Sequence, residues 1–361
     1  MDVSPFPYQG PLAPAEVGGR DDLLRDLTER VTGGRVTALL GPRRYGKTSV
    51  LRRLAADLTE VTTVWVDLYE VTSLADVAVR FDDALGATTG PFAAAARAVA
   101  ASVSVNLGVV KVELTGPARN RPDPGLTFHG LLEVLVTAAT REPTLLVVDE
   151  FASIGRVDGA AGTLRTAIQH HYRDLGVVFA GSHPSMMRTL FTARAQPFYG
   201  QADLVEIDPL SSGAVDAIVR SGFVTSGRGA GPVAGLVAGL AAGHPQRTMQ
   251  LADACWRRTP AGATADAGTW IAALDDVRRA TGEGMERLYS GFERGERSVL
   301  RAVARGGSIY GAEADLLDLS NGTATHARRT LLDSGDLVDV GRGLAVVDPI
   351  LADWLRRRFP I

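Results

Sequence analysis

The residues Gly41-Pro-Arg-Arg-Tyr-Gly-Lys-Thr48 have the spacing of a phosphate-binding loop. Glycine lets backbone N–H groups turn inward around phosphate oxygens. Lys47 would place a compact ammonium between the β- and γ-phosphates, and Thr48 would offer its hydroxyl to Mg²⁺. Only two of the 38 basic residues are lysines, and a planar guanidinium would be too large for this position. The string therefore predicts a nucleoside triphosphate site.

An acidic pair ends the apolar run Leu145-Leu-Val-Val-Asp-Glu150. After a strand, Asp149 would join Thr48 in the Mg²⁺ shell, and Glu150 would polarise the attacking water as a general base. In isolation such a pair could equally be a strand cap or a solvated turn. Its position about 100 residues after the loop favours the catalytic interpretation, because open α/β sheets bind ligands at the carboxyl ends of their strands.

Further polar residues follow the next strand and lie in the helical region beyond it. Ser182 could sense the γ-phosphate or position the water, although a local turn bond is the alternative. His183 precedes a proline and is mostly expected to cap a helix. Arg247 could move onto the phosphates, or lie on a solvated helix face. Arg188 and Arg194 are arginine-finger candidates by position alone.

The predicted site is therefore specific in its residues. We expect catalysis to depend on Lys47, Glu150 and Ser182, and Mg²⁺ to be held by Thr48 and Asp149. The predicted nucleotide-binding residues are Gly41, Pro42, Arg43, Arg44, Tyr45, Gly46, Lys47, Thr48, Ser49 and Arg247.

The elements around these residues alternate between strand and helix. Strands are expected at residues 35–40, 61–67, 143–150, 176–182 and 204–207. Helices are expected at 20–31, 49–56, 73–85, 91–101, 126–140 and 157–175. This alternation predicts a mostly parallel sheet covered on both faces. The strand, loop and helix around Lys47 are the context that the motif requires.

The remaining segments give the domain organisation. Residues 1–19 form a proline-rich extended lead-in, and 20–210 form a P-loop NTPase core with a hairpin insertion at about 90–125. Within the insertion, residues 102–114 alternate as strand, turn and strand, and Lys111 has no assigned role. Residues 211–284 are expected to form a helical lid, and 285–361 a winged helix-turn-helix domain of three helices and a hairpin.

Composition limits the partners and the compartment. The net charge is −3, and residues 285–361 hold 11 arginines and 11 acidic residues, which disfavours a strongly basic nucleic-acid binder. DNA could still contact the third helix, at 323–334, where His326, Arg328 and Arg329 face outward. A single cysteine, Cys255, and an opening without a signal-peptide pattern favour the cytoplasm and no membrane partner.

The assembled motifs resemble prokaryotic AAA+-like and STAND-type ATPases, called archaeal-type ATPases, which are related to origin-recognition ATPases. The phosphate loop and Val148-Asp-Glu-Phe151 carry the resemblance, and weaker likenesses lie at Gly19-Arg20, Gly243-His-Pro245 and 347–356. The resemblance implies ATP with Mg²⁺ and hydrolysis. One departure is Gln201, where many relatives have arginine, so an inter-subunit arginine role there is in doubt.

Two functions remain open from the sequence. The first is an ATP-hydrolysing molecular switch that couples nucleotide state to the C-terminal domain, with a protein partner or a homo-oligomer as the partner alternatives. The second is a DNA-binding regulator that uses ATP as a structural or conformational ligand. A kinase is less consistent with the Asp149–Glu150 pair, which suits water activation.

Overall fold

The structure, a computed structural model, describes residues 3–103, 107, 108, 114, 122–311, 314, 316–341 and 343–359. The chain divides into two compact units. The sheet unit comprises Asp21–Gly41 and Lys47–Ile207. The helical unit comprises Met1–Arg20, Pro42–Gly46 and Asp208–Ile361.

A five-stranded parallel sheet forms the centre of the sheet unit, as the sequence predicts. Its order is β2-β3-β4-β1-β5, and every pairing is parallel. All five strands therefore end at the same edge. Their bounds are β1 Thr37–Leu40, β2 Thr62–Asp67, β3 Thr144–Asp149, β4 Leu175–Gly181 and β5 Asp203–Glu206.

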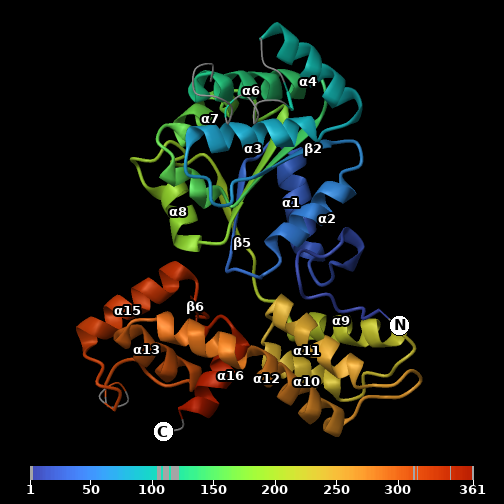
Figure 1. Cartoon of the computed structure of the whole chain (residues 1–361), viewed down its shortest axis with the longest axis vertical. Coiled ribbons are helices and arrows are strands. Elements are labelled where there is room, and N and C mark those ends of the chain that lie inside the picture. The colour runs from blue at the N-terminus through green and yellow to red at the C-terminus, as the bar shows by residue number, and fades with distance from the viewer. Residues whose placement is uncertain are drawn as a thin grey trace. The chain divides into compact units, whose positions relative to one another are not determined.

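Helices cover both faces of this sheet, because alternate strand residues are buried in opposite directions. Ala38 and Leu40 join a core shared with α3, α4, α6 and α7, and the first three of these helices stack side by side (Figure 1). Gly176 on β4 instead meets Val31 of α1. The helices are α1 Asp21–Thr32, α2 Lys47–Asp57, α3 Leu74–Gly86, α4 Gly90–Ser102, α6 Pro124–Ala139, α7 Ala160–Ile168 and α8 Pro184–Thr192.

Two expected elements of this unit are not found as predicted: one is shorter in the structure, and the other lies mostly outside the described residues. The helix expected over 157–175 is wrong in extent, because α7 ends at Ile168 and a turn leads into β4. The residues directly after Glu150 form a 3₁₀ helix, Phe151–Arg156. The strand–turn–strand expected over 102–114, with Lys111, lies mostly outside the described residues, and Ser102 itself ends α4.

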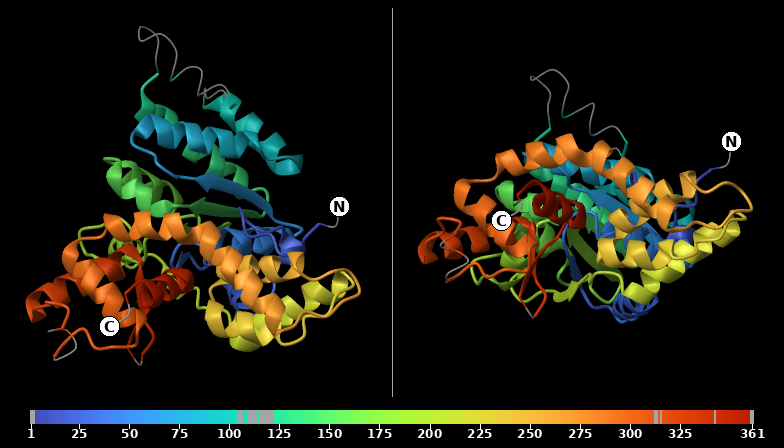
Figure 2. Two further views of the ribbon diagram at one scale, coloured as in Figure 1. Left: turned by 60° about the horizontal axis from the view of Figure 1, so that its bottom comes forward. Right: turned by 90° about the horizontal axis from the view of Figure 1, so that it is seen from below.

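The helical unit begins with α9 Ser212–Thr225, α10 Val233–Ala241, α11 Pro245–Arg257 and α12 Ala267–Gly291. The lead-in joins its core through Phe6, which packs against Phe223, and contains a short 3₁₀ helix, Pro14–Glu16. Figure 2 shows α12 as a long rod that contacts both α11 and the later helix α16. The domain boundary expected at residues 284 and 285 falls inside α12.

The C-terminal elements are α13 Arg294–Ala304, α15 Asn321–Ser334, the antiparallel hairpin β6 Leu337–Asp339 with β7 Leu344–Val346, and α16 Pro349–Arg358. These match the first helix, third helix and hairpin that the sequence predicts. The middle helix, expected at 311–319, falls partly on residues outside those described. Within the described chain, no helix has the length and apolar content of a membrane span.

Candidate functional site

The phosphate loop begins where β1 meets the carboxyl edge of the sheet. A Cβ on Gly41 would lie 2.2 Å from Cγ2 of Ile207, so the chain can pass Ile207 only with glycine at this position. Gly46 has a φ of 86°, which also favours glycine. Lys47 is the first residue of α2, is buried, and donates from Nζ to the Gly41 carbonyl oxygen at 2.8 Å. The ammonium is thus held against the first residue of the loop.

Thr48 and Asp149 meet at this edge, although 101 residues separate them. The threonine hydroxyl donates to Oδ2 of Asp149 at 2.8 Å. Burial raises the pKa of the Asp149 carboxyl, while the hydrogen bonds from Thr48 and from the Glu150 backbone oppose that rise. A buried carboxylate beside a hydroxyl is the oxygen-ligand pair expected of a Mg²⁺ site.

Glu150 and Ser182 also lie together, at the ends of β3 and β4. The Ser182 hydroxyl donates to Oε1 of Glu150 at 2.6 Å, and the Ser182 N–H donates to Oε2 at 3.3 Å. Glu150 has a left-handed backbone, with φ 50° and ψ 38°, which is uncommon for a non-glycine residue. Its neighbour Phe151 is buried against Phe179 at a ring-centroid distance of 4.2 Å. We infer that this packing holds the strained turn and aims the Glu150 carboxylate along the edge.

Asp67 is a residue that the sequence analysis did not single out. It ends β2 and is the register partner of Asp149 on β3. Its charge adds to the rise in the pKa of Asp149, and its Oδ1 accepts the Tyr69 N–H at 2.9 Å. The signal that could have found it is the carboxylate that closes the run 61–67, in the same position as Asp149 on its own strand. Asp67, Asp149 and Glu150 together give this edge a concentration of negative charge.

A triphosphate with Mg²⁺ fits these residues. Lys47 and the loop N–H groups supply positive charge for phosphate, and Thr48 with Asp149 supplies two oxygen ligands. Among the described residues no group of three or more His, Cys, Asp or Glu side chains could hold a metal ion. Mg²⁺ in nucleotide sites usually takes one or two carboxylates and completes its shell with phosphate and water, and Asp149 with Thr48 could supply the protein ligands of such a shell.

The middle of the phosphate loop, Pro42–Gly46, clusters with the helical unit. Tyr45 is buried, and its ring meets His244 edge-on at a centroid distance of 5.1 Å. Arg20, from the lead-in, donates to the carbonyl oxygens of Asp208 at 2.6 Å and Tyr45 at 3.4 Å. Arg43 and Arg44 are exposed. The middle of the phosphate loop therefore contacts the rest of the helical unit through Tyr45.

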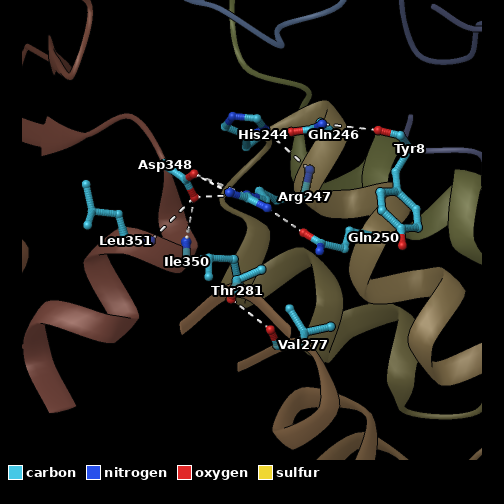
Figure 3. A network of polar contacts seen from close by, with 10 residues as sticks. All are labelled: Tyr8, His244, Gln246, Arg247, Gln250, Val277, Thr281, Asp348, Ile350 and Leu351. Carbon is cyan, nitrogen blue, oxygen red and sulfur yellow. Dashed lines mark hydrogen bonds and ion pairs between the residues drawn. The ribbon is translucent and has the colours of Figure 1, made fainter. Parts of the chain in front are cut away.

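Arg247 lies in a buried ion pair in the helical unit (Figure 3). Its Nε donates to Oδ1 and Oδ2 of Asp348 at 3.0 and 3.2 Å, and its Nη2 donates to Oδ2. Arg247 is 4% exposed. Asp348 also caps α16 by accepting the Ile350 N–H at 2.9 Å. Burial opposes ionisation of Asp348, but Arg247, His244 and the Ile350 N–H together outweigh it, so the pKa of the carboxyl is lowered. The nucleotide-binding role of Arg247 remains a prediction and requires this pair to open.

His244 connects the loop middle to the ion pair. It caps α11, and its Nδ1 accepts the Arg247 N–H at 3.3 Å. Burial lowers the pKa of His244 to about 4; Asp348 opposes this shift, and Arg247 and Arg44 add to it. The imidazole is therefore neutral at pH 7. Contacts run from Tyr45 through His244 to Arg247 and Asp348, all within the helical unit.

The remaining candidates are more peripheral. Ser49 is buried in the first turn of α2. His183 is at the N-cap position of α8, without a side-chain cap hydrogen bond. Arg188 pairs with Glu206, whereas Arg194 is exposed, and no ion pair to a described carboxylate is seen for it.

The sequence matches no protein-family model, and no curated protein matches it. Solved structures do resemble the chain. The Walker-type ATPase PABY2304 of Pyrococcus abyssi superposes with a TM-score of 0.71 and 17% identity over 98% of this chain and 99% of that chain. The ADP form of the Aeropyrum pernix ORC2 protein gives 0.54 and 14% over 98% of each chain. The A. pernix ORC1 protein in complex with DNA gives 0.50 and 15% over 94% of this chain and 93% of that chain.

This chain has the fold of these ATPases. The resemblance to archaeal-type and origin-recognition ATPases that the motifs predict is confirmed at the level of fold, along nearly the whole chain. The predicted fold class, with its five-stranded P-loop core, is confirmed as well. At these identities the likeness concerns architecture, so activity has to be argued from this chain's own residues.

Proposed function

We propose that the protein binds ATP with Mg²⁺ and hydrolyses it. The observation that carries this proposal is the joint placement, at one sheet edge, of a buried Lys47, the Thr48–Asp149 hydrogen bond of 2.8 Å and the Glu150–Ser182 hydrogen bond of 2.6 Å. These are the phosphate, metal and water-activating groups that phosphoanhydride hydrolysis requires. ATP, rather than another triphosphate, follows from the resemblance.

Each residue has a defined task in this proposal. Lys47 and the loop N–H groups bind and orient the phosphates, and Thr48 and Asp149 hold Mg²⁺. When bound, the ion neutralises negative charge on the phosphate oxygens. Glu150 accepts a proton from the water whose oxygen forms the new bond to the γ-phosphorus, while the bond to the bridging oxygen breaks and ADP leaves. Ser182 holds the carboxylate in place for that proton transfer.

The test is phosphate release from ATP and Mg²⁺ by the full chain and by Glu150→Gln. We expect the variant to lose at least about a hundredfold in turnover while retaining ATP binding, because general-base catalysis contributes on that order. Glu133→Gln, which changes an exposed carboxylate on α6, is the matched control and should keep full turnover. Lys47→Ala should lose ATP binding. Equal turnover in Glu150→Gln and Glu133→Gln would contradict the role of Glu150.

We further propose that the nucleotide state is coupled to the C-terminal elements. Four observations support this: the loop middle clusters with the helical unit, Tyr45 contacts His244, His244 accepts from Arg247, and Arg247 pairs with Asp348 at the start of α16. A change in the loop would reach α16 through adjoining contacts. The winged-helix assignment and the boundaries 211–284 and 285–361 belong to this proposal.

Hydrogen exchange on Glu150→Gln, with and without ATP and Mg²⁺, tests the coupling. If nucleotide loosens the Arg247–Asp348 pair, the Ile350 and Leu351 amides, which donate to Asp348, should exchange faster with nucleotide bound. If the exchange rates of these two amides do not change at saturating ATP, the proposed coupling is contradicted. The proposal of ATP hydrolysis would not be affected by that result.

DNA binding through residues 323–334 is the second candidate, and the ORC1 structure with DNA is its support. The charges weigh against it. Arg328 pairs with Asp339 at 3.5 Å and Arg329 with Asp333 at 3.8 Å, so neither guanidinium is free of an acidic neighbour. A protein partner or self-association remains the other prediction.

A further inference from the structure

A pocket of about 340 Å³ lies against one face of α13, away from the residues of the phosphate loop in the sequence. Three arginines spaced three and four residues apart line it, so they lie on one side of the helix. Tyr289 from α12 and the segment that ends at Asp318 complete the lining. The polar residues that matter are Tyr289, Arg294, Arg297, Ser298, Arg301 and Asp318.

The lining residues that the structure describes carry more positive than negative charge. Arg294 pairs with Asp318 at 3.4 Å, but both side chains are 82% exposed, so the pair is weak. Among the described residues no carboxylate lies within ion-pair distance of Arg297 or Arg301. Among the described lining residues, three arginines face one aspartate, whereas Arg278 and Arg357 share Asp353.

Aromatic rings hold the two guanidinium groups that lack a carboxylate. The Arg301 guanidinium lies 4.8 Å from the Phe359 ring centroid, and that of Arg297 lies 6.0 Å from the Tyr289 centroid. Tyr289 itself packs against Phe359 at 5.0 Å. Stacking on a ring leaves the N–H edge of a guanidinium free to donate. The cations are therefore supported by faces that do not compete for their hydrogen bonds.

Arg301 has an unmet donor. Its Nε is buried without a hydrogen-bond partner, although Tyr289 interacts with another part of the guanidinium. Burial raises the pKa of the Tyr289 hydroxyl, and the charges of Arg301 and Arg297 oppose that rise. Both guanidinium groups therefore lie close enough to this hydroxyl to act on it. An unsatisfied buried donor and two adjacent cations without a counter-charge are both costly. An anion in the pocket would supply the counter-charge that the two cations lack, although the buried Nε of Arg301 would not contact it directly.

We propose that this pocket binds the phosphate group of a small phosphorylated molecule. Guanidinium forks match phosphate oxygens in paired hydrogen bonds, and Arg297 with Arg301 would supply them, with Ser298 beside them. The volume falls in the range of small-molecule sites and exceeds that of a lone phosphate ion. A concave pocket with an acidic rim at Asp318 fits a compact ligand better than the continuous backbone of a duplex. The site is separate from the proposed hydrolysis and does not depend on it.

The experiment uses pyrophosphate as the probe on the full chain carrying Lys47→Ala, which removes binding at the phosphate loop. Calorimetric titration should show one site. Adding Arg297→Gln or Arg301→Gln should weaken pyrophosphate binding at least about tenfold, since each removes a charged donor. Arg329→Gln, which removes an 85% exposed arginine of α15, is the matched control and should not change affinity.

Further arms make the outcome decisive. Arg297→Lys keeps the charge but not the fork, so intermediate affinity with an unchanged thermal melt would support paired recognition and show that folding is intact. No binding by Lys47→Ala, or equal weakening in Arg329→Gln, would overturn the proposal. Preferential binding of a duplex or a phosphoserine peptide through Arg297 and Arg301 would assign the pocket to a macromolecule and overturn it as well. None of these results depends on ATP turnover.

Discussion

Two polar clusters in this chain differ in how their charges are balanced. At the sheet edge, Asp67, Asp149 and Glu150 gather negative charge around hydroxyl groups, and Asp149 carries a raised pKa. In the helical unit, Arg247 and Asp348 neutralise each other, and Asp348 carries a lowered pKa. A bound ligand of opposite charge would stabilise the sheet edge, where negative charge is in excess. The charges of Arg247 and Asp348 already neutralise each other and need no ligand. The first cluster therefore has the character of a binding site, and the second that of a structural ion pair.

Breaking the matched pair should have the largest effect. Asp348→Ala would leave the Arg247 guanidinium buried without its counter-charge, and we expect a loss of about 3–5 kcal/mol in the free energy of unfolding. Denaturant titration measures this. The double variant Arg247→Met with Asp348→Leu removes both charges and should recover much of the loss. A single variant as stable as the wild type would show that the pair is not the constraint described here.

Acid should loosen the same region before it protonates Asp348. The pKa of His244 is lowered to about 4 in the folded chain from an ordinary 6.5, so the unfolded chain binds more protons between these values. Stability is complete above pH 6.5 and should fall by on the order of 3 kcal/mol as the pH drops toward 4. Asp348 and Tyr45 face this imidazole together with Arg247 and Arg44. Thermal melts across this range measure the slope.

The matched variants for this pH dependence are His244→Asn and His170→Asn. Asparagine at 244 keeps a helix-capping acceptor but does not titrate, so the slope should flatten. His170 is exposed, and its replacement should leave the slope as it is. A slope that survives in His244→Asn would place the titration elsewhere.

A substitution at the start of the phosphate loop tests the sheet-edge half of this comparison. Gly41→Ala would put a Cβ 2.2 Å from Cγ2 of Ile207, and overpacking of this kind typically costs about 1–3 kcal/mol. ATP affinity, measured by titration, should fall because the loop is displaced. Ile207→Ala in the same chain removes the opposing methyl group and should restore part of the affinity. If the single variant binds ATP normally, the contact does not shape the loop.

The smallest expected effect is at Ser182. Ser182→Ala removes the hydroxyl that donates to Glu150 at 2.6 Å but leaves the base in place, so turnover should fall by about tenfold, or about 1.4 kcal/mol. Ser182→Thr should retain most of the rate. A loss as large as that of Glu150→Gln would mean that Ser182 acts on the reacting groups directly.

The sequence predicts the sheet edge well because its signals are local. The phosphate loop sits between a β-prone run and a helix-prone run, and Asp149 and Glu150 close an unbroken apolar run. Each strand of the parallel sheet begins and ends within two residues of its expected bounds. The end of α7 was missed because the chain turns after Ile168 to reach β4, a requirement of the sheet rather than of local propensity.

The helical unit was harder to predict where its contacts are long-range. Arg247 and Asp348 are 101 residues apart, and the sequence around either residue does not indicate that they pair. As a result, the arginine that the sequence assigns to phosphate lies in a buried ion pair. Asp67 was missed for a related reason, since its importance comes from its register with Asp149 on another strand. Side-chain partners brought together by tertiary packing have no pattern along the chain.

The strand order also has a consequence for how the protein is made. β1, which leads into the phosphate loop, pairs with β4 and β5, so Thr37 finds its neighbours at Val178 and Asp203. During synthesis β1 is therefore made more than a hundred residues before either of its partner strands. Such distant pairing slows folding and leaves an apolar strand exposed. A chain stopped before β4 would contain the whole phosphate loop motif and still lack the sheet that shapes it.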